Sequence, residues 1–147
     1  LYDFKIGSLV DMDIAEAREF LFKHHRGVLA TYRKDGNLQI SPVTPGVDDE
    51  GRVIISSRET AFKTKNIRRN PKVSLCAFHD AFHGSVWIQV NGCAEIVSQP
   101  EAMELLLDFQ RRVKGDTDWE EYRKRMERER RVLIRIKMES VGPNRRG

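Results

Sequence analysis

Two short glycine-containing turns, at residues 34–37 (KDGN) and 48–51 (DDEG), constrain the fold of this chain more than any other feature. Each turn joins two strand-like segments, and Asp35 with Gly36 can supply the positive backbone angles of a two-residue hairpin. Such short loops join antiparallel neighbours, because parallel strands need a crossover of a dozen or more residues. The turns therefore argue against a βαβ parallel sheet and predict hairpins.

The remaining elements follow from local sequence patterns. β-branched and aromatic residues predict six strands, at 27–33, 38–43, 52–57, 72–79, 85–97 and 131–138. Helical spacing predicts helices from Asp13, from Thr60 as N-cap up to Pro71, from Ser98 and from 116 onward. Capping pairs are predicted for Asp13 with Glu16 and for Ser98 with Glu101. This order predicts a mainly β fold with short α-helices, in the form of a small antiparallel barrel.

Length and composition predict one domain, residues 1–147, because 147 residues with 39% hydrophobic side chains can bury one core. The net charge of +4 is a mild excess that favours anionic partners without demanding one. Cys76 and Cys93 lie in strand-like runs without metal-ligand spacing, so they are interpreted as buried apolar residues in a reducing cytoplasm. No apolar run is long enough to cross a bilayer, so no membrane contact is expected.

Common catalytic motifs do not occur in the sequence. There is no GxGxxG, GxxxxGK[ST], GxSxG or HExxH. His79, Asp80 and His83 have ligand chemistry but fall at a strand end and in a loop, so no metal site is predicted. Trp119 and the helical positions that follow it could line a ligand pocket, although this spacing more often indicates core or subunit contact. The catalytic residues stay unknown.

The segment 57–71 (SRETAFKTKNIRRNP) is the strongest candidate binding element. A strand that ends in Ser56 and Ser57 leads into a short helix whose first turn carries Lys63 and Thr64. Helix N-termini attract anions through unsatisfied N–H groups and the positive end of the dipole, so a phosphate site is predicted there. An ordinary solvated basic helix is the alternative. A nucleic-acid site is not expected, since only Phe62 could stack on a base.

Taken in order, several motifs resemble the flavin/deazaflavin-binding split β-barrel family, the superfamily of pyridoxamine 5′-phosphate oxidase, and within it the branch that uses coenzyme F420. The matching segments, spread over residues 14–138, are GVLATYRKDGNLQISPV, GRVIISS, KTKNIRRNPKVSL, VNGCAEI, DWEEYRKRM and RVLIRI. The resemblance implies a six-stranded antiparallel split β-barrel. It also implies a homodimer with two cofactor sites at the subunit interface and a small-molecule substrate.

The resemblance also nominates cofactor-binding residues. Those that would hold the phosphate are Lys63, Thr64, Asn66, Ser56 and Ser57. Those that would border the isoalloxazine-like ring are Gln39, Ser41, Pro42 and Val43. Residues near 82–87, with Trp87 among them, and Arg131 would reach the cofactor of the partner subunit. Relatives often place an arginine where this chain has Ala61, and Lys65 or Arg58 would compensate.

These expectations lead to one functional prediction and two alternatives. The prediction is a cytoplasmic oxidoreductase that uses F420 for hydride transfer to a small activated organic substrate. A flavin-like ring carries out hydride transfer itself, so the lack of an acid/base motif is no objection. The alternatives are an FMN-binding oxidase or reductase of the same fold, and a non-catalytic cofactor carrier.

Overall fold

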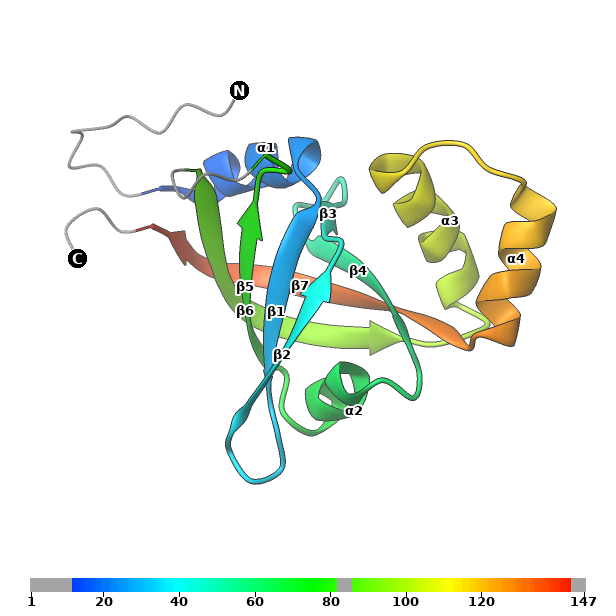
Figure 1. Ribbon diagram of the computed structural model, residues 1–147, viewed down its shortest axis with the longest axis horizontal. Coiled ribbons are helices and arrows are strands. Elements are labelled where there is room, and N and C mark those ends of the chain that lie inside the picture. Colours follow the sequence, from blue (N-terminus) through cyan, green and yellow to red (C-terminus); the bar gives the residue numbers. More distant parts are fainter. Residues whose placement is uncertain (1–11, 82–85, 144–147) are drawn as a thin grey trace.

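A seven-stranded antiparallel sheet forms the centre of the computed structural model, which describes residues 12–81 and 86–143 (Figure 1). The strands are β1 (Arg26–Tyr32), β2 (Leu38–Val43), β3 (Gly46–Val47), β4 (Val53–Arg58), β5 (Lys72–Phe78), β6 (Trp87–Val97) and β7 (Arg131–Gly142). The helices are α1 (Ile14–Lys23), α2 (Phe62–Arg69), α3 (Ala102–Val113) and α4 (Trp119–Arg128). The mainly β, antiparallel architecture is as predicted. The strand count of six is corrected to seven, because the two-residue β3 is too short to show alternation.

The order of the strands explains why the barrel is split. The sheet runs β2-β1-β5-β6-β7-β4-β3, so β2 and β3 lie at its opposite edges. Only Thr44 and Pro45 separate these two strands in the chain. The sheet must therefore curl until its edges approach each other, although β2 pairs only with β1 and leaves its other edge open. This open edge faces the region where the candidate site lies.

Both hairpin turns are three-residue loops, which corrects the two-residue hairpin predicted at Asp35 and Gly36. Arg33 N donates to Asn37 O at 2.8 Å, so three residues lie between the paired ends, and only Gly36 has a positive φ, of 88°. The second turn repeats this arrangement between Asp48 and Arg52, with Gly51 at φ 78°. A three-residue loop needs the left-handed conformation only at its last position, which explains why one glycine is sufficient.

Two hydrophobic clusters cover opposite faces of the strands. Phe20 and Leu21 of α1 pack on the inner face together with Leu29, Ile55 and other buried side chains. The second cluster joins α3 and α4 to the outer face of β4 and β7; its strand members are Ile54 and Leu133. In Figure 1, α3 and α4 lie side by side at one end of the molecule. This helical pair therefore stands next to β4, where the phosphate site is predicted.

The predicted helix caps agree with the structure at α1 but not at α2 or α3. Asp13 accepts a hydrogen bond from Glu16 N at 2.8 Å, as predicted. Thr60 is not the cap of α2, because that helix begins at Phe62 after Ala61. Ser98 does not cap α3 either. Its hydroxyl instead donates to a carboxylate oxygen of Glu59 at 3.0 Å and accepts from Arg68 at 2.8 Å.

The prediction that the two cysteines are buried is wrong. Cys76 and Cys93 are both exposed. Cys76 lies opposite Val28 of β1 and Gln89 of β6, on the face of the sheet that α1 does not cover. Alternation along the strand fixed which residues share a face, but the sequence did not show which face would be left open.

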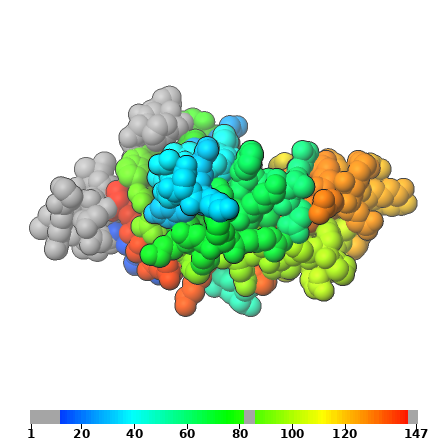
Figure 2. All heavy atoms as spheres, turned by 90° about the horizontal axis from the view of Figure 1, so that it is seen from below, coloured from blue at the N-terminus to red at the C-terminus, as the bar shows by residue number. Residues whose placement is uncertain are grey.

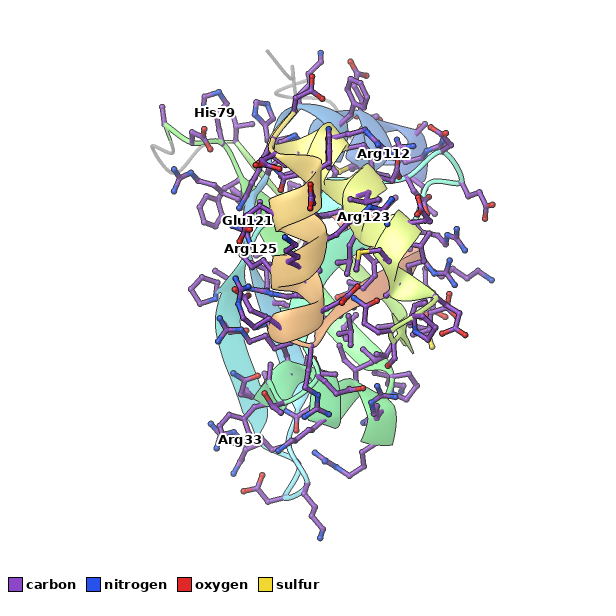
Figure 3. All side chains as sticks on the ribbon, turned by 90° about the vertical axis from the view of Figure 1, so that its right-hand side faces the viewer. Arg33, His79, Arg112, Glu121, Arg123 and Arg125 are labelled. Carbon is purple, nitrogen blue, oxygen red and sulfur yellow. The ribbon has the colours of Figure 1, made fainter. Side chains whose placement is uncertain are left out.

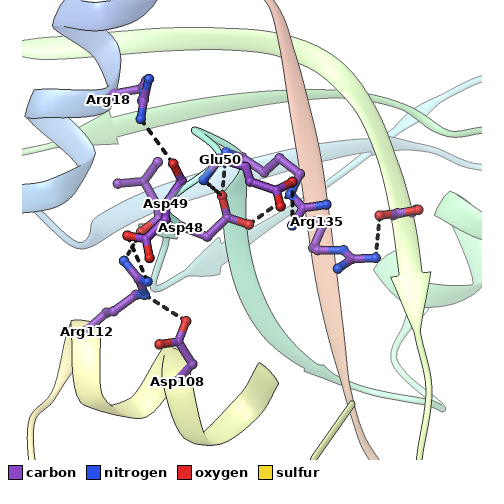
Figure 4. Close-up of polar contacts among 10 residues, drawn as sticks. Arg18, Asp48, Asp49, Glu50, Asp108, Arg112 and Arg135 are labelled. Carbon is purple, nitrogen blue, oxygen red and sulfur yellow. Dashed lines mark hydrogen bonds and ion pairs between the residues drawn. The ribbon is translucent and has the colours of Figure 1, made fainter. Parts of the chain in front are cut away.

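Ion pairs and a hydrogen bond to the backbone tie the turn between β3 and β4 to the flanking helices. Arg112 of α3 contacts Asp108 at 2.7 Å and Asp49 at 3.1 Å, and these contacts raise the pKa of its guanidinium (Figure 4). Arg18 of α1 donates to the backbone oxygen of Asp49 at 3.5 Å. One turn therefore anchors both α1 and α3, and this anchorage helps to hold α3 beside the candidate site.

Candidate functional site

A pocket of about 430 Å³ lies between the end of β2, strand β4 and the helices α2, α3 and α4. Its volume is in the range of small-molecule sites. Its lining residues are Pro42, Val43, Thr44, Ser56, Arg58, Lys63, Phe109, Gln110, Lys114, Tyr122, Arg125, Met126, Glu129 and Arg131. The pocket thus brings together the open edge of the sheet and the start of the basic helix.

The pocket is strongly cationic. Five of its side chains are Lys or Arg and only Glu129 is acidic. Arg58 and Arg131 are direct cross-strand partners, so two like charges lie opposite each other. Glu129 contacts Arg131 Nε at 2.9 Å and Arg58 Nη2 at 3.4 Å, and the hydrogen bond from Arg131 is the main cause of its lowered pKa. One carboxylate therefore serves two guanidinium groups, which leaves excess positive charge for an anionic ligand.

The turn between α4 and β7 places these charges. Arg130 has a φ of 51°, the left-handed conformation that side chains other than glycine rarely adopt. Its carbonyl accepts a hydrogen bond from Glu59 N at 2.9 Å, which ties this turn to the connection between β4 and α2. Glu129 and Arg131, on either side of Arg130, consequently both reach the pocket.

Lys63 is the pocket cation on which the predicted phosphate site depends. It lies at the second position of α2 and is half-buried. Burial is the main cause of its lowered pKa, and the charge of Arg131 lowers that pKa further. None of the ion pairs among residues 12–81 and 86–143 includes Lys63. A half-buried ammonium group without a counter-ion is an arrangement that a bound anion would stabilise.

The N-terminus of α2 supplies a second attraction for an anion at the same place. Ala61, the residue before the helix, makes no side-chain cap, and its backbone N–H donates to Arg58 O at 3.1 Å. The first N–H groups of a helix have no partner within the helix, and the dipole makes this end positive. Lys63, adjacent to these groups, therefore does not act alone.

The structure places the predicted site residues in two groups. One group lines the pocket: Pro42, Val43, Ser56, Lys63 and Arg131. In the other group, Ser57 and Thr64 are buried and their hydroxyls lie 3.0 Å apart, while Thr64 Oγ1 also donates to Arg58 O at 2.7 Å. These two hydroxyls hold the end of β4 against α2.

Asn66 also serves the packing of α2. It is buried, donates from Nδ2 to Thr31 Oγ1 at 3.1 Å and accepts from Arg69 at 2.8 Å. Gln39 accepts from the same Thr31 hydroxyl at 3.3 Å. Gln39 and Asn66 line a smaller cavity beside α2, separate from the pocket of Lys63. Figure 2 shows the β1–β2 hairpin and α2 next to each other on this face.

Ser41 and Trp87 lie outside the pocket lining. The Ser41 hydroxyl is buried and has no hydrogen-bond partner, directly before Pro42 and Val43 in β2. An unpartnered buried hydroxyl at this position is consistent with a polar ligand edge beside β2. Trp87 begins β6 opposite Phe78 and is half-buried. Residues 82–85, expected near a partner's cofactor, lie outside the described residues, and so does His83.

Most of the pocket-lining residues that come from α3, α4 and their ends were not predicted from the sequence. Lys114, Arg125 and Glu129 line the pocket although no sequence spacing linked them to Lys63. Figure 3 shows Arg125 on α4, in the view that faces this end of the molecule. Tyr122 and Met126 are buried, so the interpretation of this stripe as core is confirmed, but both also line the pocket. The late motif DWEEYRKRM was the signal that could have pointed to this helix.

Among the described residues, no three His, Cys, Asp or Glu side chains are grouped so that they could hold a metal ion. No helix within residues 12–81 and 86–143 is long and apolar enough to span a membrane.

Three solved structures are similar to the chain over most of its length. A conserved hypothetical protein of Mycobacterium tuberculosis has a TM-score of 0.74 at 25% identity, over 97% of this chain and 91% of the other. A structure described as an F420 reductase has a TM-score of 0.67 at 25% identity, over 85% and 94%. An FAD-binding protein of Mesorhizobium loti, with a TM-score of 0.62 at 22% identity over 90% and 94%, shows the fold alone.

The family comparison covers nearly all of the described chain. The model of the pyridoxamine 5′-phosphate oxidase family matches residues 14–144. This range includes every strand of the sheet and the whole lining of the pocket. It confirms the family that the motifs indicated. The chain belongs to the pyridoxamine 5′-phosphate oxidase family of flavin-type oxidoreductases.

Proposed function

We propose that this protein is an oxidoreductase that uses coenzyme F420 for hydride transfer to a small activated organic molecule. The observation that carries the proposal is Lys63, half-buried without a counter-ion at the uncapped start of α2. A phosphate group bound there would meet the lysine and the helix N–H groups together. The likeness to a structure described as an F420 reductase supports the choice of cofactor.

The chain's own residues would bind and orient the cofactor. Lys63, Ser56 and Arg58 would hold the phosphate, with Arg131 in the same pocket. Pro42 and the rest of the β2 end would lie along the ring, and Tyr122 and Met126 would shield it from water. The side chain of Tyr122 is held in place, because its hydroxyl donates a hydrogen bond to Leu106 O at 3.0 Å. When bound, the deazaflavin ring supplies the hydride chemistry.

The other predicted residues keep secondary roles in this proposal. Ser57, Thr64 and Asn66 would hold α2 in place rather than contact the phosphate, in line with their internal hydrogen bonds. Gln39 would help to hold α2 through Thr31, Ser41 would pair with a polar edge of the cofactor, and Trp87 would meet the cofactor of a second subunit. The protein would act as a homodimer in the cytoplasm.

Titration of the purified protein with F420 and with FMN, followed by fluorescence, tests the choice of cofactor. We expect saturable binding of F420 and affinity for FMN at least about tenfold weaker, a difference of about 1.4 kcal/mol. FMN that is retained tightly through purification would contradict the proposal and favour the FMN-dependent alternative. If reduced F420 binds but no acceptor oxidises it, the protein is a carrier instead.

A further inference from the structure

A second compartment continues from the pocket of Lys63 past the end of β2. It has a volume of about 600 Å³ and shares residues 42–44 and Lys114 with that pocket. Its other walls come from the start of β1, the end of β5 and the end of α3, with Val28 and Phe78 among them. A space of this size accommodates a small organic ligand beside whatever occupies the first pocket.

Most charges of this compartment are already paired. Arg26 contacts Asp80 at 2.8 Å, and Lys23 contacts Glu19 at 3.3 Å. Lys114, at the C-cap of α3, belongs to none of the ion pairs among the described residues. Lys114 is therefore an unpaired cation at the boundary between the two compartments.

His25 adds a hydrogen-bonding group to the same compartment. Its Nδ1 lies 2.9 Å from the backbone oxygen of Pro45. Because a carbonyl oxygen only accepts, Nδ1 must carry the hydrogen, and Nε2 of the neutral ring is left to accept a hydrogen bond from a ligand. Apolar parts of the walls include Val28, Phe78 and Val113. The compartment thus combines apolar surface with the unpaired cation of Lys114 and the acceptor nitrogen of His25.

We propose that this compartment is the substrate subsite and that it selects a small, partly apolar molecule with a carboxylate, which binds to Lys114. This inference rests on the proposed function, because the shared residues 42–44 would place such a molecule next to the cofactor ring. The substrate class is therefore an unsaturated carboxylic acid. A neutral compound of the same shape would leave the free cation unpaired and bind more weakly.

Calorimetric titration with trans-cinnamate and with cinnamamide, its neutral counterpart of nearly the same shape, tests the proposal. We expect cinnamate to bind about tenfold more tightly than the amide, the scale of one charge-assisted hydrogen bond. Lys114→Gln should weaken cinnamate by about fivefold and leave the amide unchanged. Lys72→Gln, which removes an exposed cation at the start of β5, is the matched control and should change neither ligand.

The outcomes separate this inference from the cofactor proposal. Lys63→Ala should weaken F420 but leave cinnamate binding intact, so loss of cinnamate in that variant would overturn the separate subsite. Equal affinities for acid and amide, or no binding of either, would overturn it as well. If F420 does not bind while cinnamate shows the expected pattern, the proposed function fails and the anion subsite stands. Lys114 is exposed, so its replacement should leave the fold intact.

Discussion

A lysine that is partly buried without a carboxylate is unfavourable for folding, because burial disfavours the charged ammonium form. Lys63 has this environment, and the neighbouring charge of Arg131 adds to the cost. A phosphate at the start of α2 would relieve both effects at once. At the scale of single residues, the unfavourable burial of the Lys63 ammonium group is thus consistent with a site for an anionic ligand.

His24 gives a prediction for the dependence of stability on pH. Its Nε2 is buried without a partner and its ring lies 4.5 Å from the ring of His79. Burial first, then the charges of His79 and His25, lower the pKa of His24 from 6.5. The unfolded chain therefore binds a proton more readily, so this contribution to stability is present above about pH 6.5 and is lost as the pH falls below that value.

The variant His24→Phe tests this prediction, because it keeps a ring next to Phe20 without a titrating group. Thermal unfolding of both proteins at pH 7.5 and pH 5 gives the comparison. The fall in Tm between the two pH values should be smaller in the variant. An equal fall in both proteins would assign the pH dependence to other groups.

At the scale of elements, the sequence predicted those contacts that form between residues close together in the chain. The cap at Asp13 is a contact within four residues, and the structure has it. The cap predicted at Ser98 failed because its hydroxyl is engaged by Glu59 and Arg68, which lie far away in the chain. Strand β3, at the second edge of the sheet, was not predicted, because two residues are too few to show a periodic pattern.

The residues of the candidate site divide in the same way, into those that the sequence could assign and those that depend on tertiary packing. Ser56 and Lys63 could be assigned to one site because a strand end and a helix start follow each other in the chain. Lys114 and Arg125 could not, because their place depends on how the α3–α4 pair packs on Ile54 and the rest of the second hydrophobic cluster. Burial of hydroxyls such as that of Thr64 likewise depends on this tertiary packing.

At the scale of the whole molecule, the outer face of the β1–β2 hairpin is left apolar and open. Ile40 is 61% exposed, and Leu38 and Tyr32, which lie opposite each other, are 50% and 38% exposed. These side chains share one face, since they alternate with the buried Leu29 and Thr31. A patch of this kind is typical of an interaction surface, and we propose that a second copy of the chain covers it.

Ile40→Lys tests this assembly, because it places a charge in the middle of the apolar face. Sedimentation velocity should show a dimer for the unmodified protein and a shift towards monomer for the variant. Phe22→Lys is the matched control: Phe22 is 68% exposed on α1, away from this face, and its replacement should leave the dimer intact. A monomeric unmodified protein would contradict the proposed homodimer.

The most direct test of the central claim is the affinity of the Lys63→Ala variant for F420, measured by fluorescence titration beside the unmodified protein and Lys72→Ala. We predict that Lys63→Ala weakens binding by at least about 1.5 kcal/mol, the scale of a lost charge-assisted hydrogen bond, with an unchanged circular dichroism spectrum. Lys72→Ala should bind as the unmodified protein does. Unchanged affinity in the folded Lys63→Ala variant would remove the lysine from the site and contradict the account.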